Sequence, residues 1–123
     1  MRARLVLSSA LLVAAAPAAT QQSSQAHMEA CTVWNYGGER VGTRNDCDRP
    51  VAILFMAFSD QRILEAEVPA GGWFDSGLSA GVADGFIFTA CPVGFMPSLR
   101  FSMENRVQIA ESLYNCVPGR PNS

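Results

Sequence analysis

The stretch TRNDCDRPVAILFMAF, Thr43 to Phe58, places a cysteine and a proline just before eight consecutive apolar residues. Because proline has no backbone N–H group, Pro50 fits the start of a strand and not its middle. The apolar run from Val51 to Phe58 is typical of a strand that is covered on both faces. A helix is the alternative, since Ala, Leu and Met also favour helices. The flanking turn residues and the short length favour the strand.

Residues 1–19 have the pattern of a secretory signal peptide. Two arginines precede the apolar run Leu5–Ala16, and Ala16-Pro17-Ala18 supplies small residues before a cleavage point near Ala18 or Ala19. A membrane anchor is the alternative, but the run is shorter than the roughly 20 apolar residues that cross a bilayer. We therefore expect a secreted or periplasmic protein with no membrane span in the mature chain.

The charge of the expected mature chain is negative. The sequence has 9 Arg and no Lys against 11 acidic residues, so the loss of Arg2 and Arg4 leaves 7 against 11 and a net charge of −4. The remaining arginines are scattered, whereas nucleic-acid binding rests on clustered Lys and Arg at phosphates. This composition argues against a nucleic-acid partner.

About 104 residues follow the signal peptide, which is enough for one domain. Residues 20–29 are polar and are expected to form a flexible tether that includes His27, the only histidine. Residues 30–117 are expected to form a disulfide-linked β-domain, and residues 118–123 a frayed tail.

Four cysteines in an exported chain predict two disulfides. A metal site is disfavoured because zinc ligands come at tight spacings such as C-x2-C, and here the gaps are 16, 44 and 25 residues. We favour pairs between neighbours along the chain, with one alternative. The favoured pairs are Cys31–Cys47 with Cys91–Cys116, and the alternative is Cys47–Cys91 with Cys31–Cys116.

Several segments outside the apolar run predict antiparallel strands. Gly37-Gly38 separates two β-rich runs, which is a hairpin signal, and a two-residue turn would place Trp34 opposite Val41. The run RILEAEV from Arg62 to Val68 alternates between an apolar and an acidic face, as in a half-exposed strand.

The second half of the chain is less regular. We expect a turn at Pro69-Ala70-Gly71-Gly72 and a loop-rich segment that follows it. GFIFTAC, 85–91, predicts a strong strand, PVGFMP, 92–97, a turn region, and LRFSM, 99–103, a short strand. The segment 105–116 fits a strand or a helix that Asn105 would cap, and we favour the strand. The predicted fold class is all-β, a small antiparallel β-sandwich of about 6–8 strands, with one short C-terminal helix as the open alternative.

Catalytic machinery is weakly indicated. The lone histidine lies in the expected tether, the cysteines are expected to be oxidised, and there is no lysine, so nucleophile–base pairs are disfavoured. Paired carboxylates stay open in principle, although turn and solvated-face roles are simpler for them. The candidate acids are Asp46, Asp48, Asp60, Glu65, Glu67, Asp75 and Asp84. We expect no enzyme activity, no cofactor and no metal site.

Aromatic residues are the best candidates for a binding surface. Trp73 and Phe74 follow Gly71-Gly72 and are adjacent, so in a strand they cannot both face one core. Trp and Tyr rings often contact carbohydrates or proteins, and Trp34, Tyr36 and Met96 are further candidates. Core packing is the alternative for all five.

The motif pattern resembles a group of small secreted proteobacterial β-domains. It consists of N-x-C-x-x-P-V over Asn45–Val51, a P-x-G turn at Pro69–Gly71, and A-C-P at Ala90–Pro92. It resembles more faintly the start of thaumatin-like proteins, which are longer and richer in cysteine. The resemblance implies a disulfide-linked β-domain and no catalytic residues.

Three functions are compatible with these observations. The first is an exported non-enzymatic β-domain that binds a protein or an envelope component, or acts structurally. The second is a secreted inhibitor or effector that acts on another protein through the segment Pro69–Leu78. The third is a hydrolase that uses two carboxylates.

Overall fold

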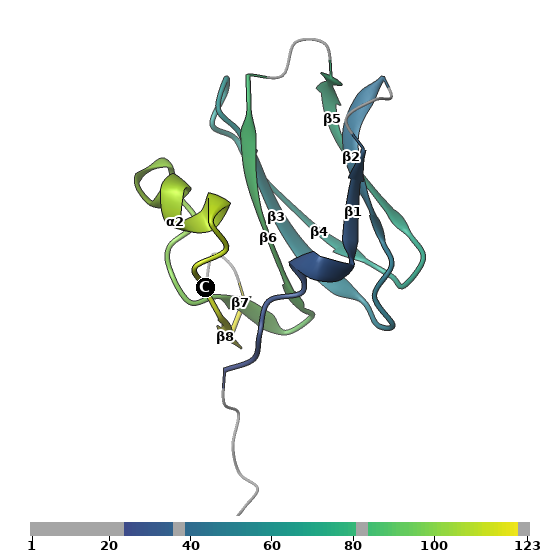
Figure 1. The fold of residues 1–123 in the computed structure, drawn as a ribbon, viewed down its shortest axis with the longest axis vertical. Helices are drawn as coiled ribbons and strands as arrows, with labels where there is room; N and C mark the ends of the chain where they lie inside the picture. The colour runs from purple at the N-terminus through teal and green to yellow at the C-terminus, as the bar shows by residue number, and fades with distance from the viewer. Residues whose placement is uncertain (1–23, 36–38, 81–83, 121–123) are drawn as a thin grey trace, which may run out of the picture.

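The computed structural model describes residues 24–35, 39–80 and 84–120. Two three-stranded antiparallel sheets, β1-β2-β5 and β4-β3-β6, pack face to face, and the C-terminal segment forms a further layer outside the second sheet (Figure 1). A two-stranded ladder, β7-β8, belongs to that layer. The predicted antiparallel β-sandwich is therefore confirmed, and the short C-terminal helix, the open alternative, is present.

The element bounds follow the chain in order. They are η3 Glu29–Cys31, β1 Thr32–Asn35, β2 Arg40–Asn45, β3 Val51–Ala57, β4 Ile63–Val68, β5 Trp73–Ser79, β6 Phe86–Pro92, β7 Phe95–Pro97, η5 Met103–Asn105, α2 Arg106–Ala110 and β8 Cys116–Pro118. Within the described residues, no helix has both the length and the apolar character needed to cross a membrane.

The apolar run is the central strand, as predicted. β3 lies between β4 and β6 in its sheet, and all its residues except Ala52 are buried. Val51, Ile53 and Phe55 belong to the core between the two sheets. Leu54 and Met56 point to the other side, where they pack with Phe101 and Ile109 of the C-terminal layer.

The β1–β2 pair forms in a register that differs from the prediction. Trp34 lies opposite Thr43 and not opposite Val41, because the connection is longer than a two-residue turn. The predicted turn at Gly37-Gly38 and the candidate Tyr36 lie outside the described residues. Trp34 and Val41 still both pack in the core between the sheets.

The alternating strand after β3 is confirmed. Leu64, Ala66 and Val68 of β4 turn inward, whereas Glu65 and Glu67 are exposed. The predicted turn at 69–72 is also present, with Gly71 at φ 80° and the Gly72 N–H donating to the Pro69 carbonyl. A positive φ at the third turn position is the reason for a glycine there.

The prediction of a loop after this turn is wrong, because Trp73–Ser79 forms the edge strand β5 against β2. The ladder is irregular: Asp75 lies opposite Gly42, but Ser79 lies opposite Arg40. Two extra residues are therefore accommodated on β5, as in a β-bulge. This irregularity and the glycines hid the strand from a pattern analysis.

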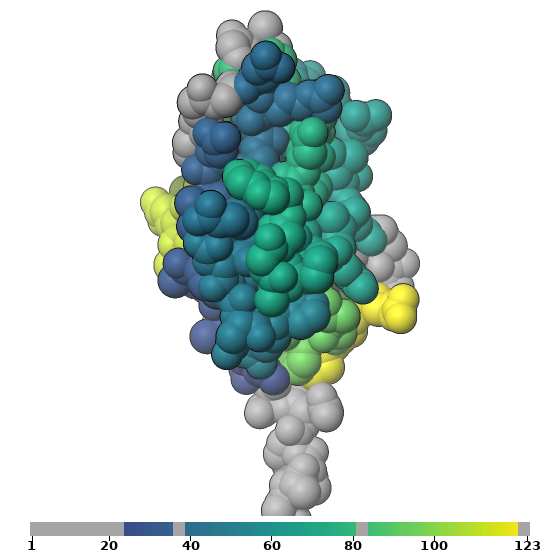
Figure 2. All heavy atoms as spheres, turned by 90° about the vertical axis from the view of Figure 1, so that its right-hand side faces the viewer, coloured from purple at the N-terminus to yellow at the C-terminus, as the bar shows by residue number. Residues whose placement is uncertain are grey.

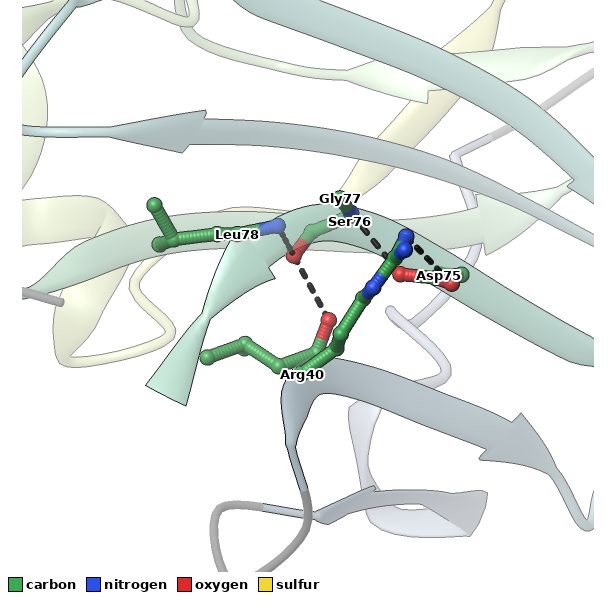
Figure 3. Close-up of polar contacts among 6 residues, drawn as sticks. Arg40, Asp75, Ser76, Gly77 and Leu78 are labelled. Atoms are coloured by element: carbon green, nitrogen blue, oxygen red, sulfur yellow. Dashed lines mark hydrogen bonds and ion pairs between the residues drawn. The ribbon is translucent and has the colours of Figure 1, made fainter. Parts of the chain in front are cut away.

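Side chains replace ladder hydrogen bonds in the irregular part of β5 (Figure 3). The buried Ser76 hydroxyl donates to the Val41 carbonyl over 2.6 Å and accepts the Leu78 N–H over 3.0 Å. The Asp75 carboxylate accepts the Gly77 N–H over 2.8 Å and forms an ion pair with Arg40. The irregular part is therefore ordered by specific hydrogen bonds.

The C-terminal predictions need three corrections. Residues 95–97, expected as a turn region, form β7, and residues 99–103, expected as a strand, do not. The first part of 105–116, for which we favoured a strand, contains the helix α2. The Asn105 side chain does not cap this helix but donates to the Arg100 carbonyl over 2.7 Å.

The short helix is explained by its packing. Ile109 is 2% exposed and contacts the outer side of the second sheet, whereas Val107 is 57% exposed. Burying one large apolar side chain contributes about 1.5–3 kcal/mol. An isolated helix of five residues is not stable in water, so this tertiary contact decides the local structure.

Two disulfides form, and they are the pairs that we favoured. Cys31–Cys47 joins the start of β1 to the β2–β3 connection, and Cys91–Cys116 joins β6 to β8. No cysteine is free. Closing loops of 16 and 25 residues stabilises the fold by about 3 kcal/mol each in the chain-entropy account.

The described end of the expected tether packs on the domain. Met28 is 7% exposed and its N–H donates to the Ala90 carbonyl, while Gln25 pairs with Cys116. His27 lies over Tyr114, with 5.0 Å between the ring centroids. Burial, and then Glu29, raises the pKa of the Tyr114 hydroxyl far above its usual range. The domain thus includes residues before Cys31.

Asn45 is a fully buried polar residue at the corner between the two sheets. Its side-chain amide donates to the Arg49 and Val68 carbonyls over 3.0 and 2.8 Å, and its carbonyl oxygen accepts the Cys47 N–H over 2.8 Å. Its backbone also bonds to Gly71 and Gly72 of the β4–β5 turn. One side chain therefore joins β2, the β2–β3 connection and the end of β4.

We expect Asn45→Ala to lower the free energy of unfolding by about 2–4 kcal/mol, because it leaves buried backbone groups without partners. Chemical denaturation with the disulfides intact measures the change. Asn115→Ala is the control, since that residue is exposed, and it should change stability by less than about 0.5 kcal/mol. Equal effects of the two substitutions would contradict the assigned role of Asn45.

Candidate functional site

The structure separates the two adjacent aromatic candidates. Trp73 is 58% exposed on the outer face of the β1-β2-β5 sheet, whereas Phe74 is 6% exposed and packs in the core. Successive residues of a strand point to opposite faces, so this division follows from the strand conformation of β5. Of this pair, Trp73 alone is available to a partner.

Trp73 belongs to a row of side chains that crosses the outer face. Val33, Arg44 and Trp73 lie opposite one another on β1, β2 and β5. The Arg44 guanidinium lies 6.0 Å from the Trp73 ring centroid and binds the Asp46 carboxylate with two hydrogen bonds, which lower the pKa of Asp46. Figure 2 shows β2 and β5 side by side on this face, with no deep hollow between them.

Trp34 lies on the inner side of the same sheet. Its ring centroid is 4.3 Å from that of Phe88, 5.1 Å from that of Phe86 and 6.0 Å from that of Phe55. These contacts place Trp34 in an aromatic cluster between the two sheets. The arrangement gives Trp34 a packing role and leaves it little surface for a ligand.

A groove of about 530 Å³ lies outside the second sheet, between β3–β4 and the segment 96–103. Most of its lining is apolar and includes three methionines. The lining residues are Leu54, Met56, Gln61, Ile63, Glu65, Met96, Pro97, Leu99, Arg100, Phe101, Ser102 and Met103. Small-molecule sites have volumes of about 300–1,000 Å³ and mainly apolar linings with a few polar groups. This groove fits that description.

The apolar floor and rim of the groove differ in exposure. Leu54 and Met56 are 6% and 2% exposed, whereas Ile63 at the β4 side is 44% exposed. Methionine side chains are flexible and polarizable, and they adapt to ligands of different shape. The groove therefore combines a closed floor with an adaptable, accessible rim.

Three polar residues of the lining are candidates for polar contacts with a ligand. Arg100 is exposed and forms no ion pair within the described chain. The Ser102 hydroxyl oxygen is buried and has no hydrogen-bond partner among the described residues. Glu65 lies on β4 and has an interaction partner. The groove thus offers a positive group and a hydroxyl beside apolar surface.

Sequence reasoning did not find this groove. Its residues come from β3, from the start of β4 and from a segment some forty positions later, so no local motif marks it. We expected the segment 99–103 to be a strand, and a regular strand packed beside the sheet would not leave a hollow. The signal that was available is the number of apolar residues in 95–103, a segment of which only 95–97 belongs to a strand.

The carboxylate candidates are mostly dispersed. Glu65 and Glu67 both line a smaller cavity of about 140 Å³ beside Thr89, and both side chains are exposed. Asp46 and Asp75 are held by arginines, and Asp60 accepts the Arg62 N–H in a turn. Within the part of the chain that the structure covers, no three His, Cys, Asp or Glu residues are grouped as metal ligands.

Comparison with known proteins adds no relative. No protein-family model matches the chain, and the searches of curated proteins and of solved structures found no match either. The groove and the exposed face around Trp73 are therefore the features that indicate a function.

The two adjacent aromatics predict opposite outcomes on substitution. Phe74→Ala should cost about 3–5 kcal/mol of stability because it opens a cavity in the core. Trp73→Ala should change stability by less than about 1 kcal/mol, because the ring is mostly exposed. Denaturation curves of the two variants measure the contrast, and a large loss in Trp73→Ala would show that its ring is a packing element.

Proposed function

We propose that the chain is an exported, non-enzymatic binding domain that holds an apolar component of the cell envelope in the groove between β3–β4 and the segment 96–103. The observation that carries the proposal is the apolar lining of this groove. A mainly apolar hollow with a few polar groups is the usual form of a small-molecule site. An apolar ligand would remove Ile63, Met96 and Met103 from water.

The rigidity of the scaffold supports a binding role. One wall of the groove is the β4-β3-β6 sheet, and the other wall is the segment 96–103. The C-terminal layer that contains this segment is tied to the sheet by the Cys91–Cys116 disulfide and by Ile109. A preformed site loses less conformational entropy when its ligand binds. The groove is thus built on elements that do not need to fold with the ligand.

Export is supported by the disulfides and by the N-terminal sequence. Disulfides persist in oxidising compartments and are rare in the cytosol, and this chain has two of them and no free cysteine. The basic and apolar start of the chain has the signal-peptide pattern. The resemblance to secreted proteobacterial β-domains points the same way and stays a prediction.

The second candidate function is protein binding through the Trp73 face. The observation that favours it is the alignment of exposed Val33, Arg44 and Trp73 on one flat surface. The segment Pro69–Leu78 is not the protruding loop that an inhibitor would use, since most of it is β5. Flat aromatic surfaces suit proteins better than small apolar ligands.

A neutral fluorescent probe, N-phenyl-1-naphthylamine, should bind the groove of the oxidised protein. We expect Ile63→Glu to weaken this binding by about tenfold or more, because it places a charge beside the apolar lining. A fluorescence titration of the folded variant measures the dissociation constant.

Val33→Glu is the matched control for this titration. Val33 is also a strand residue and is 44% exposed, as Ile63 is, but it lies on the outer face of the other sheet. The control should bind the probe as the unchanged protein does. If the probe binds equally to both variants, or if Val33→Glu alone loses binding, the groove is not the apolar site.

Export is tested separately by mass spectrometry of the full-length chain expressed in a bacterium with a periplasm. We expect the protein in the periplasmic fraction, with an N-terminus after Ala18 or Ala19 and a mass that corresponds to two disulfides. A cytoplasmic protein that retains Met1 and four free thiols would contradict the proposal of export.

A further inference from the structure

Arg100 is a charged residue that lines the groove. The ion pairs Arg40–Asp75 and Arg44–Asp46 use other arginines, and Arg100 takes part in neither. Its backbone is fixed, because the Asn105 side chain donates to the Arg100 carbonyl. Arg100 thus lines the groove from an anchored backbone position, and the residue is exposed.

The second charged residue of the lining does not cancel this positive charge by itself. Glu65 belongs to β4, whereas Arg100 belongs to the segment 96–103 on the other side of the groove. Glu65 also has an interaction partner already. Gln61 and Ser102 are uncharged. Arg100 is therefore the one group of the lining whose charge is complementary to an anionic head group.

Ser102 supplies an independent observation. Its hydroxyl oxygen is buried without a hydrogen-bond partner in the described part of the chain, although it is two residues from Arg100 and lines the same groove. A buried hydroxyl without a partner is unfavourable, and a serine hydroxyl reorients by rotation about one bond. An acceptor bound in the groove would satisfy it once rotation about the Cα–Cβ bond turns the buried oxygen toward the groove.

We propose that the ligand is a fatty acid in its anionic form. Its carboxylate binds the Arg100 guanidinium and the Ser102 hydroxyl, and its acyl chain lies along Met56, Met96 and Met103. The planar guanidinium matches a carboxylate with two parallel hydrogen bonds. This inference rests on the proposed function, because it names the ligand class of the same groove.

The dimensions favour one acyl chain over larger ligands. A volume of about 530 Å³ lies in the middle of the range for small-molecule sites, and the groove offers one positive group. A two-chain lipid would leave one chain in water. An apolar peptide that ends in a carboxylate shares the charge pattern, and it is therefore included in the test.

The test uses twelve-carbon compounds that displace the neutral probe, each below its aggregation concentration at pH 8. They are dodecanoate, dodecan-1-ol and dodecylammonium, with acetate as the head group alone. We expect dodecanoate to bind about tenfold tighter than dodecan-1-ol, which corresponds to one added charge-assisted hydrogen-bond pair. Acetate should not displace the probe.

Two variants assign the preference to the proposed residues. Arg100→Gln should remove the preference for dodecanoate and leave the affinity for dodecan-1-ol unchanged, and Ser102→Ala should reduce the preference about threefold. Arg49→Gln is the control, because Arg49 is exposed on the β2–β3 connection and does not line the groove. It should keep the full preference.

The outcomes separate this inference from the proposed function. Equal binding of dodecanoate and dodecan-1-ol, or a preference that survives in Arg100→Gln, overturns the fatty-acid assignment but leaves an apolar groove. Displacement of the probe by none of the twelve-carbon compounds overturns both. Displacement only by a carboxyl-terminal apolar peptide, or sedimentation of the protein with phosphatidylcholine vesicles in place of monomer binding, also overturns the fatty-acid assignment.

Discussion

The whole architecture depends on the burial of β3 on both of its faces. A strand with seven residues from Val51 to Ala57, nearly all buried, needs a covering layer on each side, because apolar surface left in water is unfavourable. The sheet β1-β2-β5 covers one side, and the segment with α2 covers the other. A single three-stranded sheet from this chain would not be stable, so the sandwich and its extra layer form together.

Asn45 explains how the chain enters this central strand. In the N-x-C-x-x-P-V motif, the asparagine binds the N–H of the following cysteine and the carbonyls on both sides of the corner. The cysteine then joins the corner to the start of β1, and Pro50 lies where no ladder N–H is required. The spacing of the motif is therefore the geometry of one tightly bonded corner, and it carries no catalytic information.

The sequence predicted the parts of the fold that have a strong local signal. The apolar run, the alternating β4, the turn at Gly71 and the two disulfide pairs agree with the structure. The prediction was wrong where tertiary contacts decide: β5 is held through Ser76 and Asp75 side chains, and the helix α2 is held through Ile109. The groove was not predictable, since its two walls are distant in sequence. Trp73 and Phe74 were both predicted as surface candidates, because adjacent strand residues face opposite sides. Which of the two is exposed depends on the packing of β5, which the sequence pattern did not predict.

The position of the groove follows from an incomplete third layer. The C-terminal segment covers the outer side of β3 and β6 through Leu54, Met56 and Ile87, but β4 extends beyond that cover and exposes Ile63, Glu65 and Glu67. The hollow therefore lies along the boundary where the layer ends. The buried residues of β3 and the exposed residues of β4 meet at this boundary, so the groove has an apolar floor and a rim that contains both apolar and charged residues. A fold that needs two covers for one strand, and has only a short chain for the second cover, naturally leaves such an amphipathic boundary. That is why the binding surface is expected there and not on the flat outer face around Trp73, where the exposed side chains line no hollow.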